Sequence, residues 1–311
     1  MGELEDGIRR VTLPLPTRPG HVHAYLLPGE DGWIVVDTGV GTPDAKDVWR
    51  AELERAGGAV AAIFVTHMHP DHVGAAADLH ELTGAPVYQG TLDYAQCELV
   101  WGNPSWSERL RTWFRLHGVP DDVTAELVGQ SSLYRPFIRY QRDPVLMEAG
   151  EHLDGWELVA APGHSDGQLC LLKDGVLIAA DHLLPRITPT VGLWPASRPD
   201  PLGDYLGALR RMEELDARLA LPGHGEPIED PAGRARELQE HHRLRLKEAV
   251  AALGPERQTG FELSFALFGD DLKPASRRFA VAETLSHAER LVNEGAALKH
   301  EEDSTVSYTA T

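Results

Sequence analysis

The stretch VTHMHPDHVG, residues 65–74, carries three histidines and one aspartate within six positions. A protein core disfavours such side chains, because each buried imidazole or carboxylate needs a partner. The stretch begins at the end of the apolar run VAAIFV, residues 60–65, which predicts a buried strand. Residues 72–90 predict a helix followed by another strand. Side chains at the junction of this strand and this helix project from a fixed scaffold. Three histidines and one aspartate at such a place predict a metal site.

The spacing within this stretch favours two metal positions over one. His67 and His69 lie two residues apart, so in an extended chain they point in the same direction. Asp71 and His72 fall at the start of the following helix, where they turn toward a neighbouring point. We therefore expect two adjacent metal ions.

Further ligands are expected on loops that follow strands. His164 lies in APGHSDGQ after a strand, Asp181 ends the run LIAAD, and His224 lies in LALPGHGEP. Flanking glycines let the backbone turn sharply and bring an imidazole close to a metal. Five histidines and two aspartates form a donor set that suits zinc, with iron or manganese as alternatives.

The rest of the chain divides into three parts. Strand patterns alternate with helical ones, which predicts a mixed α and β architecture. Residues 91–145 are helical and tryptophan-rich, which predicts an insertion over one end of a sheet. Residues 236–311 predict three helices and a terminal β-ribbon, a winged-helix-like domain. One of these helices is opened by Thr259 and Glu262 in the spacing of a capping box.

The motif Thr66-His67-Met68-His69-Pro70-Asp71-His72 matches the signature Thr-His-X-His-X-Asp-His of the metallo-β-lactamase superfamily. Residues 8–235 resemble that superfamily. The resemblance implies an α+β fold, an αββα sandwich with a helical insertion. It also implies a catalytic domain at residues 1–235, followed by the winged-helix-like domain at 236–311.

The resemblance also implies a ligand assignment. It gives the first metal to His67, His69 and His164, and the second metal to Asp71, His72 and His224, with Asp181 bridging both. Asp181 stands where true β-lactamases commonly have cysteine, and this resembles the glyoxalase II, lactonase and thioesterase branches. The motif VVDTG is a further family feature, in which Asp37 either fixes the loop geometry around the ligands or is a turn residue at the end of a strand.

Two divalent ions lower the pKa of a shared water until hydroxide exists near neutral pH. We therefore expect a dinuclear-metal-dependent hydrolase, in which a bridging hydroxide attacks the acyl carbon of a thioester or lactone. Asp71 is the predicted catalytic residue, because it can orient the nucleophile and accept its proton. His182, directly after Asp181, is either a general acid or a buried supporting residue.

The substrate pocket is predicted from residues 182–195, HLLPRITPTVGLWP, which are largely apolar and stiffened by three prolines. Together with the tryptophans of the insertion, His182 and Trp194 would form part of an apolar pocket. Arg186 is the cation of this segment, and it would either receive a carboxylate or phosphate or form a surface salt bridge. The expected partner is a small acyl substrate.

The serious alternative is a single-strand-specific endoribonuclease of the same superfamily, since one branch carries a winged-helix-like segment. The net charge of −19 disfavours it, because nucleic-acid affinity rests on phosphate neutralisation. Arg277, Arg278 and Arg290 lie among acidic residues, so we expect the C-terminal domain to be a lid or dimerisation element of a possible homodimer. An oxygen-handling di-iron protein is a third option, but it would be expected to carry a flavin or rubredoxin domain.

The cellular location is predicted from what the sequence contains. No apolar run approaches the roughly 20 residues that a membrane helix needs. The start MGELEDGIRR has no apolar signal-peptide core, and only two cysteines are present, Cys97 and Cys170. We therefore expect a cytoplasmic protein that does not associate with membranes.

Overall fold

The structure, a computed structural model, describes residues 2–131 and 133–311. Its first sheet has the strand order β1 (Gly2–Glu3), β2 (Arg9–Pro14), β3 (His21–Pro28), β4 (Trp33–Val36), β5 (Val60–Val65), β6 (Val87–Gly90) and β7 (Val145–Met147). Strands β1 to β4 pair antiparallel, whereas β4 to β7 pair parallel. The second sheet has the order β12 (Leu219–Pro222), β11 (Val176–Ala180), β10 (Leu169–Lys173), β9 (Trp156–Ala160) and β8 (His152–Leu153).

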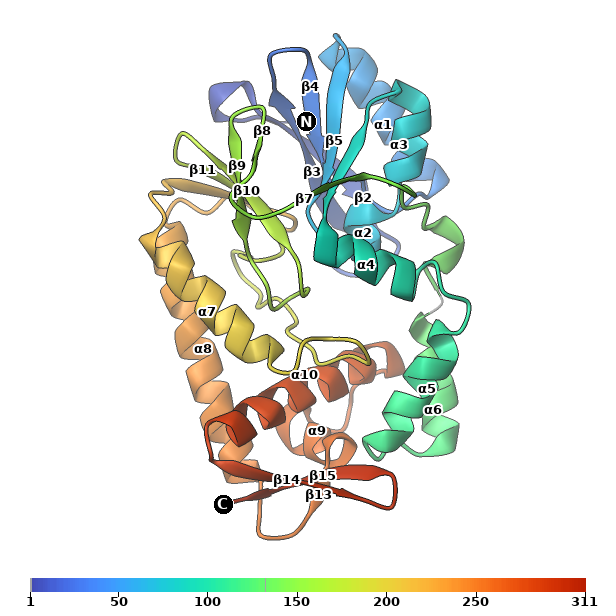
Figure 1. Cartoon of the computed structure of the whole chain (residues 1–311), viewed down its shortest axis with the longest axis vertical. Helices are drawn as coiled ribbons and strands as arrows, with labels where there is room; N and C mark the ends of the chain where they lie inside the picture. The colour runs from blue at the N-terminus through green and yellow to red at the C-terminus, as the bar shows by residue number, and fades with distance from the viewer. Residues whose placement is uncertain (1, 132) are drawn as a thin grey trace.

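Helices cover the outer face of each sheet (Figure 1). The first sheet is covered by α1 (Pro43–Ala56) and α3 (Ala76–Thr83), and the short α2 (Pro70–Val73) lies at its edge. The second sheet is covered by α7 (Pro201–Glu214) and α8 (Pro231–Ala252). Helix α1 is capped by Thr42, whose side chain accepts a hydrogen bond from the backbone N–H of Ala45.

The residues of β4 show how the layers form. Ile34 and Val36 belong to the core between the two sheets, with Phe64 of β5 and Leu158 of β9. Val35 points the other way and packs with Trp49 of α1. This alternation follows from the period of two residues in a strand, and it buries both faces of the sheet. The layers are therefore helix, sheet, sheet and helix, which confirms the expected αββα sandwich.

The predicted helical insertion contains α4 (Thr91–Val100), α5 (Trp106–Leu116), α6 (Asp121–Ser131) and the 3₁₀ turn η2 (Arg135–Phe137). It connects β6 to β7, so the chain leaves the first sheet and returns to it. The short elements η1 (Glu5–Gly7), β1 and β7 were not predicted, because two or three residues carry too little periodicity to be recognised.

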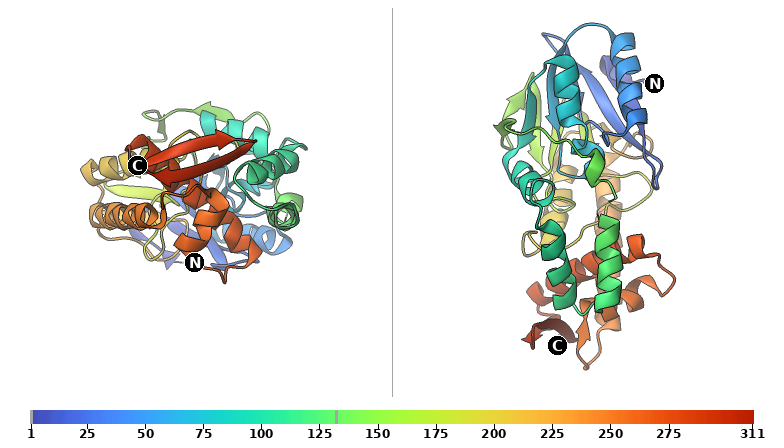
Figure 2. Two further views of the ribbon diagram at one scale, coloured as in Figure 1. Left: turned by 90° about the horizontal axis from the view of Figure 1, so that it is seen from below. Right: turned by 90° about the vertical axis from the view of Figure 1, so that its right-hand side faces the viewer.

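The C-terminal part contains α9 (Gly260–Phe268), α10 (Pro274–Asn293) and a sheet of β13 (Gln258–Thr259), β15 (Thr305–Ala310) and β14 (Ala297–Glu302). The predicted capping box of Thr259 and Glu262 and the terminal β-ribbon are both present. These elements lie at the opposite end of the molecule from α1 (Figures 1 and 2). Helix α8 runs unbroken from the sandwich into this part. The winged-helix comparison and the boundary at residue 236 stay predictions.

None of the described helices is both long and apolar enough to cross a membrane.

Candidate metal centre

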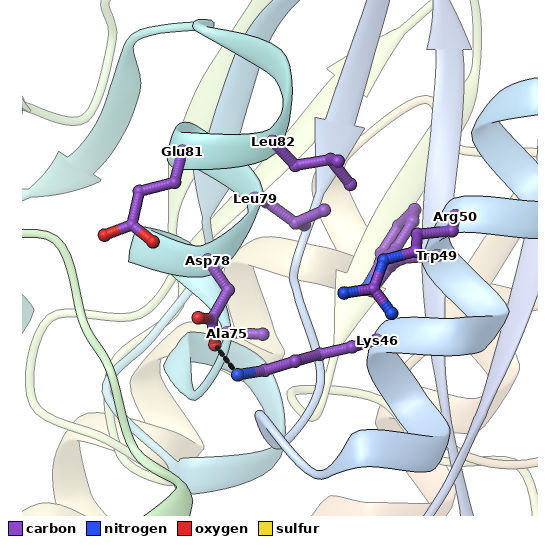
Figure 3. A pocket seen from close by; sticks show the side chains of 8 residues that line it. All are labelled: Lys46, Trp49, Arg50, Ala75, Asp78, Leu79, Glu81 and Leu82. Atoms are coloured by element: carbon purple, nitrogen blue, oxygen red, sulfur yellow. Dashed lines mark ion pairs between the residues drawn. The ribbon is translucent and has the colours of Figure 1, made fainter.

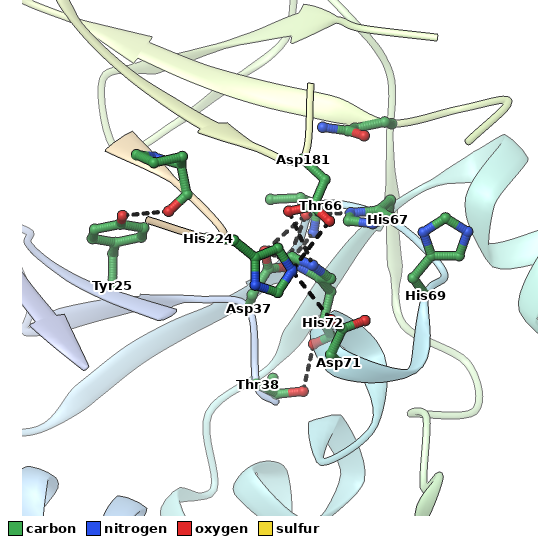
Figure 4. A network of polar contacts seen from close by, with 12 residues as sticks. Tyr25, Asp37, Thr38, Thr66, His67, His69, Asp71, His72, Asp181 and His224 are labelled. Carbon is green, nitrogen blue, oxygen red and sulfur yellow. Dashed lines mark hydrogen bonds and ion pairs between the residues drawn. The ribbon is translucent and has the colours of Figure 1, made fainter. Parts of the chain in front are cut away.

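The seven predicted ligands come from loops that follow strands and from the start of α2, and Figure 4 shows all of them except His164. His67 and His69 follow β5, His164 follows β9, Asp181 follows β11, His224 follows β12, and Asp71 and His72 lie in α2. Three sets of three have their donor atoms within 4.8 Å of one another: His67, His69 and His164; His67, His72 and Asp181; and Asp71, His72 and His224. The fold therefore brings together residues up to 157 positions apart in the sequence, from 67 to 224.

The first ligand group consists of His67, His69 and His164. Nδ1 of His69 lies 2.8 Å from Nε2 of His164. Two unprotonated ring nitrogens at that distance repel each other unless a proton or a cation lies between or beside them. Nε2 of His67 is buried and has no hydrogen-bond partner among the described residues. An unpartnered buried nitrogen is costly, so this group fits a metal ion.

The second ligand group consists of Asp71, His72 and His224. Oδ2 of Asp71 lies 3.3 Å from Nε2 of His224. Asp181 lies between the two groups, because its Oδ1 is 3.5 Å from Nε2 of His72 and its Oδ2 is 3.6 Å from Nε2 of His164. Nε2 of His72 and Oδ1 of Asp181 are buried without a hydrogen-bond partner among the described residues. These two atoms fit the ligands of a cation, and Asp181 lies between the two groups.

For three of the histidines, a hydrogen bond on the far side of the ring fixes which nitrogen faces the centre. Nδ1 of His72 donates to the carboxylate of Asp37 at 2.7 Å. Nδ1 of His164 donates to the carbonyl oxygen of Thr190 at 2.8 Å, and Nδ1 of His224 donates to that of His21 at 2.8 Å. Each bond keeps a proton on Nδ1 and directs Nε2 at the centre, as a metal ligand requires.

Asp37 supports both ligand groups. Besides His72, it accepts hydrogen bonds from the backbone N–H of Thr66 at 2.8 Å and from its hydroxyl. The same hydroxyl oxygen lies 2.9 Å from Nδ1 of His67, so it accepts the proton of that ring while donating to Asp37. These contacts agree with the supporting role expected for Asp37. Its backbone has φ 62°, a strained conformation of the kind that gathers at functional sites.

The structure shows a second supporting carboxylate, Asp93 at the start of α4, which the sequence did not reveal. Asp93 is fully buried. It accepts from the backbone N–H of Met68 at 2.9 Å and from the hydroxyl of Ser165 at 2.6 Å. Met68 lies between His67 and His69, and Ser165 follows His164, so Asp93 joins the two loops of the first group. An acidic residue in the first turn of a helix is common, so its position gave no signal.

The two ligand groups differ in charge. Burial lowers the pKa of His67 and His164, and it lowers that of His69 to about 3, with the neighbouring imidazoles adding to the effect. Burial also acts against a charge on His72 and His224, but nearby carboxylates, Asp181 foremost, raise the pKa of His72 well above its ordinary value and that of His224 to about 10.

Of the predicted pocket residues, Trp194 packs against Trp113 of the insertion with ring centroids 5.7 Å apart. His182 requires a correction, because its side chain is fully buried and packs edge-on against Tyr205, so it faces no open pocket. Arg186 is exposed, and no hydrogen bond or ion pair among the described residues holds its guanidinium.

A small surface pocket of about 270 Å³ lies elsewhere, between α1 and α3 (Figure 3). It includes none of the ligands. Its cation Lys46 pairs with Asp78 at 2.9 Å, and the rings and chains of Trp49 and Leu79 line it. Because its charges are already paired, we assign no role to this pocket.

Comparison with known proteins agrees with the geometry. Residues 17–224 match the family model of the metallo-beta-lactamase superfamily, and residues 246–311 match that of the metallo-beta-lactamase-like C-terminal domain. The chain is 26% identical to the probable metallo-hydrolase YqjP of Bacillus subtilis, over 97% of this chain and 98% of the relative. A crystal structure of the metallo-beta-lactamase family protein TTHA1429 from Thermus thermophilus has 34% identity and a TM-score of 0.85, and covers 98% of this chain and 99% of its own.

Two further similarities bear on chemistry. An atrochrysone carboxyl ACP thioesterase of Aspergillus terreus is 22% identical over 63% of this chain and 47% of its own length. The structure of TTHA1623, described as a di-iron-bound form, has 26% identity and a TM-score of 0.50, and covers 71% of this chain and 96% of its own. With the signature, the sandwich and the ligand cluster in place, the family match over residues 17–224 shows that the chain belongs to the metallo-beta-lactamase superfamily.

Proposed function

We propose that the protein is a metal-dependent hydrolase that attacks the acyl carbon of a thioester or lactone. The observation that carries this proposal is the convergence of five histidines and two aspartates, with unpartnered buried nitrogens directed at the centre. We propose two divalent ions, zinc first and iron or manganese as alternatives, held by the two ligand groups with Asp181 between them. Bound there, such ions supply an activated water near neutral pH and stabilise negative charge on the acyl oxygen.

Asp71 is the proposed catalytic residue. Its side chain is 21% exposed, whereas that of Asp181 is 9% exposed, so Asp71 is the carboxylate more open to an arriving substrate. His72 and His224 act on Asp71 against the effect of burial and lower its pKa. An ionised carboxylate that reaches solvent can orient a water molecule and accept its proton.

The requirements of the leaving group favour a thioester as the substrate. His182 is buried and cannot reach a leaving group on the open side, which removes the general acid suggested by the sequence. A thiol has an ordinary pKa of about 8.5, so a thiolate leaves without the proton that an alkoxide would need. The relative described as an ACP thioesterase supports the same choice.

The nuclease alternative has little support from the C-terminal arginines. Arg277 is buried, and its guanidinium donates to the carbonyl oxygen of Ser264 at 3.0 Å. Arg290 pairs with Asp200 at 3.0 Å and also with Glu294. Two of the three arginines are therefore engaged within the protein. A polynucleotide would need several free cations along a groove.

The test is a substrate screen on one reconstituted sample, which contains acyl-CoA thioesters, lactones and single-stranded RNA at physiological salt. We expect thioester or lactone hydrolysis that is lost on chelation and restored by zinc, iron or manganese. The Asp71→Asn variant shows whether activity belongs to this centre. Metal-dependent RNA cleavage without acyl hydrolysis would replace the proposal by the nuclease.

A further inference from the structure

Three aromatic rings from distant parts of the chain meet beside α10. Trp113 comes from α5, Trp194 from the segment that connects β11 to α7, and Phe279 from α10. The centroids of Trp113 and Trp194 are 5.7 Å apart, and Phe279 meets Trp194 edge-on at 6.0 Å. Phe279 is 42% exposed, so this cluster reaches the surface instead of closing into a core. A partly exposed aromatic cluster is a common feature of ligand sites.

Arg278 adds a cation to this cluster. Its guanidinium carbon lies 5.7 Å from the ring centroid of Trp194 and 4.5 Å from that of Phe279. Its Nε is buried without a hydrogen-bond partner, and no carboxylate pairs with it among the described residues. Burial lowers the pKa of Arg278 to about 10, which still leaves it charged at neutral pH. The chain has a net charge of −19, so carboxylates are plentiful, yet none pairs with this arginine among the described residues. Its N–H donors are therefore available to an anionic ligand.

The cluster is tied to the metal centre through one short segment. The carbonyl oxygen of Thr190 accepts from the ligand His164 at 2.8 Å. Three residues later the backbone N–H of Leu193 donates to the carbonyl oxygen of Ala282 in α10 at 2.9 Å. Trp194 follows directly. Four residues span at most about 14 Å, so one extended substrate can reach both the metal centre and the cluster.

The chemistry of this cluster defines what it can hold. Stacking on aromatic rings leaves the edge of a guanidinium free, and that edge binds a carboxylate or phosphate through two parallel hydrogen bonds. We propose that Arg278, with Trp194 and Phe279, binds a negatively charged group, phosphate or carboxylate, at the end of the substrate remote from the bond that is cleaved. The inference rests on the proposed acyl hydrolase and assigns its specificity for charged substrates to α10.

The experiment compares thioesters that differ in charge and in the side of the thioester bond that carries it. Butyryl-CoA carries phosphates on the thiol side, the butyryl thioester of N-acetylcysteamine is uncharged, and the glutaryl thioester of N-acetylcysteamine carries a carboxylate on the acyl side. We expect Arg278→Ala to raise KM about 10-fold or more for the charged substrate that the site selects, with kcat nearly unchanged. For the uncharged thioester the change should stay below about 2-fold, and the two charged thioesters distinguish the side on which the anion lies.

Two further variants serve as controls. Arg278→Gln keeps a polar side chain with the stem as far as Cδ and removes the charge, so it serves if the alanine variant does not fold. Arg198→Ala removes one positive charge from the segment that carries Trp194, at an exposed residue that pairs with Asp204, and it should leave KM unchanged for all three thioesters. Metal content and thermal unfolding of each variant report whether the fold is retained.

The outcomes separate this inference from the proposed function. If the wild-type protein hydrolyses none of the thioesters, the proposed function fails. If it hydrolyses them and Arg278→Ala changes KM equally for charged and uncharged substrates, the binding role is wrong while the hydrolase stands. If KM for the charged thioesters rises in Arg186→Ala and not in Arg278→Ala, the binding role of Arg278 is also wrong, and the exposed Arg186 binds the anionic group. Single-stranded RNA as the only substrate affected by Arg278→Ala would contradict both.

Discussion

The two ligand groups of the metal centre lie side by side but are built from different charges. In the first group, His67, His69 and His164, burial and mutual proximity lower the pKa of the imidazoles. In the second group, carboxylates raise the pKa of His72 and His224. The first group is therefore neutral and ready for a cation, whereas the second must give up protons before a metal binds. The two groups thus use similar residue types but differ in the protons that must leave before a metal binds.

The supporting carboxylates follow the same division. Asp37 contacts His72 directly and His67 through Thr66, so it serves both groups. Asp93 holds only the two loops of the first group, through Met68 and Ser165. Removing each carboxylate in turn can therefore show whether the two groups behave as one unit or as two.

The largest effect is expected for Asp181→Ala, because Asp181 is the residue that contacts both groups. We expect the metal content to fall from about two ions per chain to below one, with activity lost in parallel. The measurement is elemental analysis of the purified protein after reconstitution. A variant that retained one full equivalent with unchanged affinity would show that Asp181 belongs to one group only.

Asp71→Asn should leave most of the metal in place and reduce turnover by about 100-fold or more, which is typical of removing a positioned proton acceptor. His72 and His224 remain as nitrogen donors, which is why the second group keeps its ion. Metal content and kcat are measured on the same preparation. Turnover near the wild-type rate would show that Asp71 is a ligand without a catalytic role.

Asp37→Ala and Asp93→Ala test the division directly. Loss of a residue that orients metal ligands typically costs about 10-fold to 100-fold in metal affinity. We expect Asp37→Ala to weaken both binding steps and Asp93→Ala to weaken only the step that belongs to the three histidines. Titration with Co²⁺, followed by its absorption spectrum, distinguishes a site of three nitrogens from one that contains carboxylates. Equal weakening of both steps by Asp93→Ala would mean that the groups are coupled.

The sequence alone was sufficient to select the residues that cluster in the fold, because the Thr66–His72 motif and the Gly-flanked His164 and His224 are local patterns with direct chemical meaning. The periodicity of strands and helices predicted a mixed α and β architecture, whereas the sandwich itself followed from the resemblance to the superfamily. The sequence could not place Asp93 or Arg278, since their roles depend on contacts with residues up to 84 positions away, from 194 to 278. It also could not show that His182 is buried, because the same residue pattern suits a core and a pocket wall.

A prediction about stability concerns the charge of Asp93, which contrasts with the ionised carboxylates of the second group. Burial raises the pKa of Asp93 to about 7, although its hydrogen bonds from Ser165 and Met68 act in the opposite direction. In the unfolded chain the same carboxyl titrates near pH 4, as an ordinary aspartate does. Between about pH 4 and 7 the folded protein therefore holds a proton that the unfolded chain has released, so this residue makes the protein less stable as pH rises through that range.

Asparagine does not titrate, so Asp93→Asn removes this dependence while preserving the size of the side chain. We expect the free energy of unfolding of the metal-free variant, relative to the wild-type protein, to increase between pH 4 and 8, on the order of a few kcal/mol in total. Urea unfolding at several pH values in the presence of a chelator measures the difference, and the titrations of all other groups cancel in it. A difference that is constant with pH would show that Asp93 is ionised in the folded protein. The first ligand group would then also be supported by a charged carboxylate, and the contrast between the two groups would be confined to the ligands themselves.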